Sequence, residues 1–181
     1  MSQFVAFAEG VEVNGETVLA FLDCTAGFRE ECLAILAAHG ISSPQKGEWY
    51  PEQAWLDSFA AISTRVGKTT LNRIGMMIQK SSIFPADIKR IEDALAAIDK
   101  VYHQSHRGGE IGEYSISPLG ARKSRVTCRN PHPCEFDHGL VEAVAVASTP
   151  ADSKQVTVVH ARGGLPCRQK GGDFCAYDVS W

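Results

Sequence analysis

The spacing of the apolar residues changes once along this chain, and this change limits the possible folds more than any other feature. Between residues 51 and 106 apolar side chains recur every three to four positions, as in amphipathic helices, and Gly67 interrupts the pattern. From residue 110 onward they alternate, as in strands, with one further helix expected from Cys134. The predicted fold class is therefore α+β, with a helical N-terminal half packed on a twisted, mostly antiparallel sheet.

Turn and cap residues predict where the remaining elements lie. Asn14-Gly15 favours a two-residue turn, so residues 3–22 are predicted to form a β-hairpin. A helix is expected over residues 26–38, and Pro85 is expected to open a longer helix. The apolar spacing of that longer helix continues to His106, which should therefore lie near its buried face.

Length and charge exclude several classes of protein. The 181 residues suit one domain over residues 1–181, and no internal repeat or interdomain linker is visible. A formal net charge of −3 argues against a nucleic-acid partner. No apolar run is long enough for a membrane span, and the segment Met1 to Phe4 lacks the features of a signal peptide. A cytoplasmic protein is expected.

The segment Tyr102 to Arg107 and an upstream aromatic pair are the candidate ligand contacts. His103 and His106 share one side of a helix end and could hold a metal, a haem iron or a polar group. Complementarity with the helix dipole explains the same residues without a ligand. The aromatic pair could line a pocket mouth or fix a helix start. The candidate ligand-binding residues are Trp49, Tyr50, Tyr102, His103, His106 and Arg107.

No motif identifies a catalytic residue. Common hydrolase and c-type haem attachment motifs are absent. Gly67-Lys68-Thr69-Thr70 follows a helical pattern and lacks the earlier glycine of a P-loop. A binding protein is therefore favoured over an enzyme.

The six cysteines fall into two groups. Cys24 and Cys32 lie too far apart along a helical segment for a disulfide and are expected to be small core residues. The other four lie at the ends of predicted elements and could form a tetrahedral zinc site, act as reactive thiols beside Arg168 and Lys170, or simply pack. These four are Cys128, Cys134, Cys167 and Cys175.

Three stretches of the chain resemble bacterial 4-vinyl reductase domains. They cover residues 102–112, 128–139 and 166–177, and the third carries the pattern Cys-x-x-Lys-Gly-x-Asp-x-Cys-x-Tyr. The resemblance is best over residues 85–181. That family looks like a member of the fold superfamily of haem nitric-oxide-binding sensor domains. It implies an α+β domain that encloses an apolar pocket and forms a homodimer.

The resemblance also implies site residues and a function. A cysteine-bound metal would fall on Cys128, Cys134, Cys167 and Cys175, and a haem iron on His103 or His106. The Tyr-x-Ser-x-Arg propionate clamp of the haem sensors is replaced here by residues 128–132, which read Cys-Arg-Asn-Pro-His. The expected function is a sensory domain that binds a small hydrophobic or tetrapyrrole-like ligand and signals to a separate protein, with zinc as an optional cofactor. The alternatives are a haem-binding gas or redox sensor, and a reductase or accessory factor acting on tetrapyrrole vinyl groups.

Overall fold

A computed structural model describes residues 3–80, 84–85, 88–153, 155–161 and 167–181. Pro166, the first residue of the third resembling stretch, lies outside these residues. The described helices are α1 (Gly15–Cys24), α2 (Arg29–Ala38), α3 (Glu52–Ile78), α4 (Ile91–Gln104) and α5 (Cys134–Ala147), with the short 3-10 helices η1 (Ala26–Phe28) and η2 (Arg168–Lys170). None of these helices is long and apolar enough to cross a membrane.

The described strands form two antiparallel sheets. The small sheet has the order β2-β1-β3, and its strands are β1 (Glu12–Asn14), β2 (Trp49–Pro51) and β3 (His106–Arg107). The larger sheet has the order β4-β5-β7-β6, and its strands are β4 (Glu113–Gly120), β5 (Lys123–Arg129), β6 (Thr157–His160) and β7 (Cys175–Ser180).

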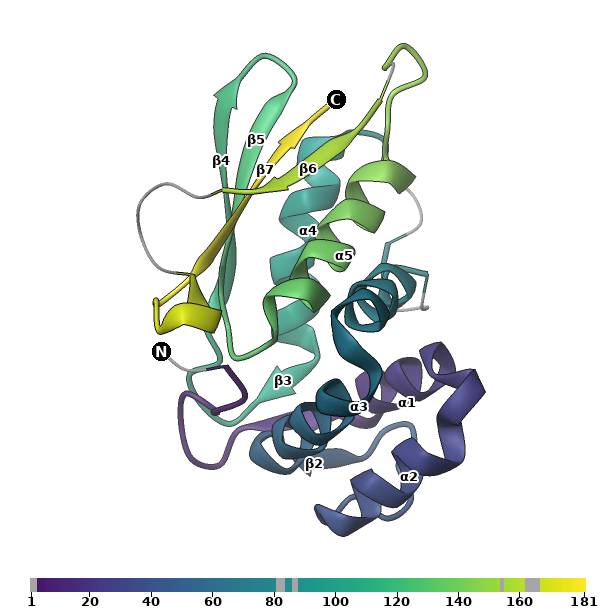
Figure 1. The fold of residues 1–181 in the computed structure, drawn as a ribbon. Coiled ribbons are helices and arrows are strands. Elements are labelled where there is room, and N and C mark those ends of the chain that lie inside the picture. Colours follow the sequence, from purple (N-terminus) through teal and green to yellow (C-terminus); the bar gives the residue numbers. More distant parts are fainter. Residues whose placement is uncertain (1–2, 81–83, 86–87, 154, 162–166) are drawn as a thin grey trace.

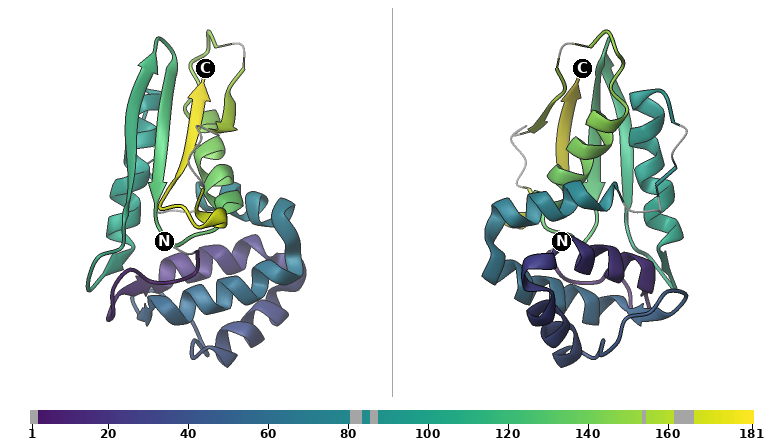
Figure 2. Two further views of the ribbon diagram at one scale, coloured as in Figure 1. Left: turned by 60° about the vertical axis from the view of Figure 1, so that its left-hand side comes forward. Right: turned by 90° about the vertical axis from the view of Figure 1, so that its right-hand side faces the viewer.

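The helices divide between the two ends of the molecule. Helices α4 and α5 lie along one face of the larger sheet, while α1, α2 and the first half of α3 gather at one end of it (Figure 1). The two further views in Figure 2 show the same division. The α+β class predicted from the sequence is therefore confirmed.

The predicted N-terminal hairpin is wrong. Asn14 accepts a hydrogen bond from the backbone N–H of Thr17 at 2.9 Å through its side chain, so it caps α1 instead of forming a hairpin turn. Gly15 follows at a crowded position, where a Cβ atom would lie 1.8 Å from the Gln45 carbonyl oxygen. The Asn-Gly pair is equally compatible with a turn and with a helix start, and tertiary contacts select the helix.

Other element boundaries also differ from the predicted ones. Gly67 interrupts α3 as expected, with a φ of 73° that favours glycine. Helix α4 begins at Ile91 rather than at Pro85, and it ends before His106, which lies in β3. His106 is nevertheless buried, as the apolar spacing predicted, and is only 7% exposed.

Helices α3 and α5 touch through their backbones. A Cβ atom at Gly139 would lie 1.9 Å from the Asn72 carbonyl oxygen, and one at Gly75 would lie 2.1 Å from the Phe136 carbonyl oxygen. Only glycine permits this approach. This contact places the start of α5 beside α1 and α3. There Phe59 of α3 packs edge-to-face on Phe21 of α1 and on Phe136 of α5.

Candidate functional site

A small cavity lies where α3, α4 and α5 meet. Its volume is about 50 Å³, which is room for about three water molecules. Its walls are mostly apolar and aromatic. They are formed by Thr17, Phe21, Trp55, Ile78, Phe84, Ile98, Val101, Tyr102, Ser105, His106, Tyr114, His132, Phe136 and Leu140.

Several buried polar atoms on or beside this wall have no hydrogen-bond partner among the described residues. Buried polar groups are normally paired, because desolvation without a compensating hydrogen bond is costly. A concentration of such atoms around one cavity therefore indicates a guest molecule or ordered water. The atoms are Thr17 Oγ1, both carboxyl oxygens of Glu52, Trp55 Nε1, His106 Nε2 and His132 Nδ1.

His106 presents one free ring nitrogen to this region. Its Nδ1 lies 2.8 Å from the Tyr102 carbonyl oxygen, which can only accept, so Nδ1 carries the proton and Nε2 has a free lone pair. Glu52 Oε1 lies 3.8 Å from Nε2. Burial lowers the pKa of His106 to about 4 and raises that of Glu52 to about 7. At neutral pH the imidazole is therefore uncharged.

His132 is the second buried histidine of the cavity. Its ring lies 5.4 Å from that of Phe136 and 5.8 Å from that of Tyr102, measured between centroids. Burial and the nearby His106 hold the pKa of His132 well below its usual value. Both histidines are thus neutral, and the cavity favours an uncharged guest.

A second group of chemically reactive side chains lies at the end of the larger sheet. One donor atom from each of Cys134, His160, Cys167 and Cys175 lies within 4.8 Å of all the others. Cys134 begins α5, His160 ends β6, Cys175 begins β7, and Cys167 directly precedes η2. Four elements that are distant in sequence therefore meet at one point.

The donors of this group suit a metal ion. Cys134 Sγ and Cys175 Sγ are 3.1 Å apart, and this hydrogen bond, together with Arg168, lowers the pKa of Cys175 to about 4. His160 Nε2 is buried without a hydrogen-bond partner among the described residues. Three sulfurs and one imidazole nitrogen form one of the standard tetrahedral zinc sets. The residues present therefore fit zinc.

The structure assembles this set differently from the sequence expectation. Cys134, Cys167 and Cys175 meet, but Cys128 is not in the group, and His160 takes the fourth place. Cys128 pairs across the strands with Cys175, yet burial and Asp137 raise its thiol pKa well above the usual value. His160 was missed because its proximity depends on β6 pairing with β7, where it lies opposite Tyr177.

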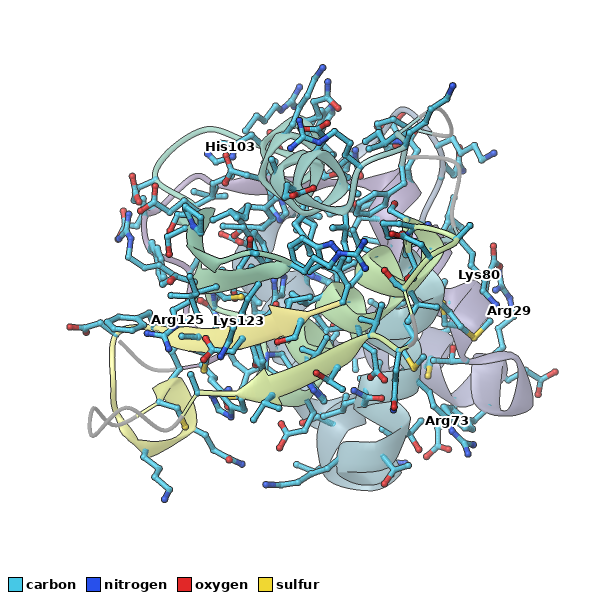
Figure 3. The ribbon with its side chains drawn as sticks, turned by 90° about the horizontal axis from the view of Figure 1, so that it is seen from above. Arg29, Arg73, Lys80, His103, Lys123 and Arg125 are labelled. Atoms are coloured by element: carbon cyan, nitrogen blue, oxygen red, sulfur yellow. The ribbon has the colours of Figure 1, made fainter. Side chains whose placement is uncertain are left out.

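The other candidate ligand residues lie away from the cavity. Trp49 and Tyr50 belong to β2, where the Arg107 guanidinium stacks 4.3 Å above the Trp49 ring and pairs with Glu12. Figure 3 shows His103 on the outer side of α4, and its side chain is 50% exposed and bonded to Asp99. Of the six candidates, only Tyr102 and His106 line the cavity.

A buried ion pair lies between the cavity and the cysteine–histidine group. Arg168, 2% exposed, donates to Asp137 on α5 and to the carbonyl and side-chain oxygens of Asn130. Asp137 also accepts a hydrogen bond of 2.7 Å from the Tyr114 hydroxyl. Arg168 was expected only as a cation near reactive thiols, because sequence spacing gives no sign of these partners.

The fold has known counterparts among solved structures. An H-NOX protein from S. oneidensis in its Fe(II)NO ligation state superimposes with a TM-score of 0.68 at 12% identity, covering 92% of this chain and 98% of that one. An oxygen-binding H-NOX domain related to soluble guanylate cyclases gives a TM-score of 0.66 at 13% identity, covering 92% and 94%.

At the level of sequence the chain has no such counterparts. No family model matches the chain, and no curated protein matches it. The resemblance to 4-vinyl reductase domains is therefore not shown, and the comparisons support only the fold that it implied. The chain has the H-NOX fold.

Proposed function

We propose that this chain is a ligand-sensing domain with two sites: a guest-binding cavity between α3, α4 and α5, and a structural zinc ion in the cysteine–histidine group. The observation that carries the proposal is the set of unpartnered polar atoms around an otherwise apolar cavity. Ligand pockets typically combine apolar walls with a few polar groups that orient the ligand.

The guest is a small, neutral, largely apolar molecule with one hydrogen-bonding group. His106 Nε2 can accept a hydrogen bond, and the indole N–H of Trp55 can donate one. Tyr102 and Phe136 provide aromatic surface for the apolar part of the guest. Charged guests are disfavoured because both cavity histidines are neutral and the cavity is desolvated.

Zinc would be held by Cys134, His160, Cys167 and Cys175. Donor atoms bound to one zinc ion lie roughly 3.5–4 Å apart, so only small side-chain movements are needed from the observed arrangement. With four protein donors the ion has no open coordination position, and it supplies cross-linking rather than catalysis. It would fasten η2 and the ends of β6 and β7 to α5.

Haem does not fit the cavity in this structure. Pockets for ligands of drug size have volumes of about 300–1,000 Å³, far above the roughly 50 Å³ of this one. Helix α4 itself offers no buried histidine, since His103 faces solvent.

A haem-binding gas sensor is nevertheless a second candidate function. It is favoured by the free Nε2 lone pair of His106 and by the H-NOX neighbours, and it requires the cavity walls to separate. Haemin titration tests it directly. A Soret band that appears in the wild type and is lost in His106→Leu would favour this candidate, and a colourless protein after titration would exclude it.

Native mass spectrometry with elemental analysis tests the main proposal. We expect one zinc per chain, lost in Cys175→Ser, and a co-purified small molecule or a measurable affinity for phenol as a probe. Phenol requires the side chains of the cavity wall to move apart, because a cavity that binds benzene has a volume of about 150 Å³. The phenol affinity should fall at least tenfold in His106→Leu and remain unchanged in the matched control His103→Leu. No phenol binding by the zinc-loaded chain, or equal losses in the two variants, would contradict the cavity assignment.

A further inference from the structure

One short segment contributes to both sites. The loop between β5 and α5 carries His132, which lines the cavity, and the first residue of α5 is Cys134, which belongs to the cysteine–histidine group. Only Pro133 separates them, and Pro131 precedes them. Because proline fixes its own φ and restricts the backbone of the residue before it, the backbone that joins the two residues has little freedom.

Arg168 holds this loop from the metal side. It directly follows Cys167, and its guanidinium donates to the carbonyl and side-chain oxygens of Asn130. The same Asn130 side-chain oxygen accepts a hydrogen bond of 2.9 Å from the backbone N–H of His132. A continuous path of bonded groups therefore runs from a metal-binding cysteine to a cavity histidine.

A second branch of the path reaches another lining residue of the cavity, Tyr114. Arg168 also donates to Asp137, which is 0% exposed and accepts from the hydroxyl of Tyr114. The Tyr114 ring lines the cavity and packs edge-to-face on Tyr102, with centroids 5.3 Å apart. The planar guanidinium can serve both branches at once, whereas a lysine ammonium has the geometry of a single point charge.

We propose that Arg168 is a positioning residue that couples the two sites, so that metal bound beside Cys167 fixes Arg168 and thereby fixes His132 and Tyr114 in the cavity wall. This inference rests on the proposed zinc site. It adds a regulatory link that neither site implies by itself. By thermodynamic reciprocity, metal and guest would raise each other's affinity by the same factor, about tenfold for a coupling of ordinary size.

The test uses the full chain after removal of metal with a chelator. Zinc is the probe for the cavity response, and cobalt takes its place where metal binding is measured by absorption. Cobalt absorption reports metal binding at the thiolates, and ¹H–¹⁵N spectra report the His132 imidazole and the Trp55 indole in the cavity. In the wild type, zinc should shift the His132 and Trp55 signals. Metal binding without any shift in these signals would overturn the coupling.

Two variants remove the link without leaving an unpaired buried charge. Arg168→Met combined with Asp137→Asn neutralises both partners, and Arg168→Lys keeps the charge but not the planar fork. In each, compared with the wild type at saturating zinc so that the effect of Arg168 on the Cys175 thiol does not enter, we expect the zinc-dependent His132 shift to be reduced at least several-fold. If the double variant fails to fold, Arg168→Lys decides the question. A full His132 response in the folded variants would overturn the inference.

A matched arginine–aspartate pair on the larger sheet serves as the control. Arg125 and Asp178 form an ion pair with contacts of 2.7 and 3.1 Å between β5 and β7, but they face away from the cavity. Arg125→Met with Asp178→Asn should leave the zinc-dependent His132 shift intact, and loss of the shift there would contradict a specific role for Arg168. Absence of the cobalt absorption band in the wild type would instead refute the zinc site itself, so the two failures are distinguishable.

Discussion

The cavity and the cysteine–histidine group use buried polar atoms in opposite ways. In the group, donors from four elements converge, and two sulfurs approach to 3.1 Å. Around the cavity, polar atoms such as Trp55 Nε1 and His106 Nε2 face apolar surroundings without hydrogen-bond partners among the described residues. Converging donors suit a small cation that completes them, whereas dispersed polar atoms suit a guest that contacts each one separately. The same backbone segment, residues 130–134, serves both arrangements.

The largest expected effect is the stabilisation by zinc, which should depend on Cys175 but not on its cross-strand neighbour Cys128. Zinc at about 1,000 times its dissociation constant should raise the free energy of unfolding of the wild type by about 4 kcal/mol. Cys175→Ser should abolish this gain because it removes a ligand, whereas Cys128→Ser should retain it. Urea unfolding with and without zinc measures both. The opposite pattern would place Cys128, not Cys175, in the metal site.

A smaller effect should appear at Glu52 beside the cavity. Burial raises its pKa from 4.5 to about 7, so the folded state retains the proton longer than the unfolded state. The wild type should therefore lose stability as pH rises from 4.5 to 7, by up to about 3 kcal/mol. Glu52→Gln cannot titrate and should not show this loss.

The pH dependence of His106 runs in the opposite direction and overlaps this window. Its pKa is lowered from 6.5 to about 4, so its contribution is lost as pH falls below 6.5. The difference between Glu52→Gln and wild type, measured by urea unfolding from about pH 5 to about pH 8, isolates the carboxyl because His106 is common to both. A constant difference across that range would show that Glu52 is not buried as described.

The backbone contact between α3 and α5 predicts an intermediate loss of stability. Gly139→Ala should cost about 1–3 kcal/mol, because its Cβ would press on the Asn72 backbone and force α3 and α5 apart. Gly27→Ala is the matched control, since a Cβ there meets nothing within 4 Å. Thermal or urea unfolding of both variants is sufficient. Equal costs for the two would mean that the helices are not in backbone contact.

The smallest expected effect concerns the exposed histidine. His103→Ala should change the free energy of unfolding by less than about 0.5 kcal/mol and leave phenol binding unaltered, because the side chain is half exposed and its polar contacts are with Asp99. Calorimetric titration with phenol compares it with the wild type. A loss of binding in His103→Ala would restore His103 as a ligand residue.

Much of the fold followed from local pattern. The apolar spacing along α3 and α4, the interruption at Gly67 and the start of α5 at Cys134 were all predictable, because each depends on residues within a few positions. The hairpin over residues 3–22 was not, since Asn14 can initiate either a turn or a helix. Tertiary contacts around Gly15 select the helix, and no local pattern encodes them.

The site was predictable only in part, and the missing residues have one property in common. Cys134, Cys167 and Cys175 were singled out by residue type, and His106 by helical spacing. His160, His132 and Glu52 were not, because each acquires its role from a partner far away in sequence. His160 meets the cysteines only because β6 and β7 pair in one particular register.

The sequence by itself determined the α+β class, the burial of His106 and the choice of three of the four clustered cysteine and histidine residues, because these depend on periodicity and on residue chemistry. Only the tertiary structure decided that Cys128 lies outside the cluster, that His160 lies within it, and that Arg168 bonds to both Asn130 and Asp137. The physical reason is that converging donors and buried ion pairs depend on strand register and on the backbone contact of α3 with α5, which arise between segments and not within them.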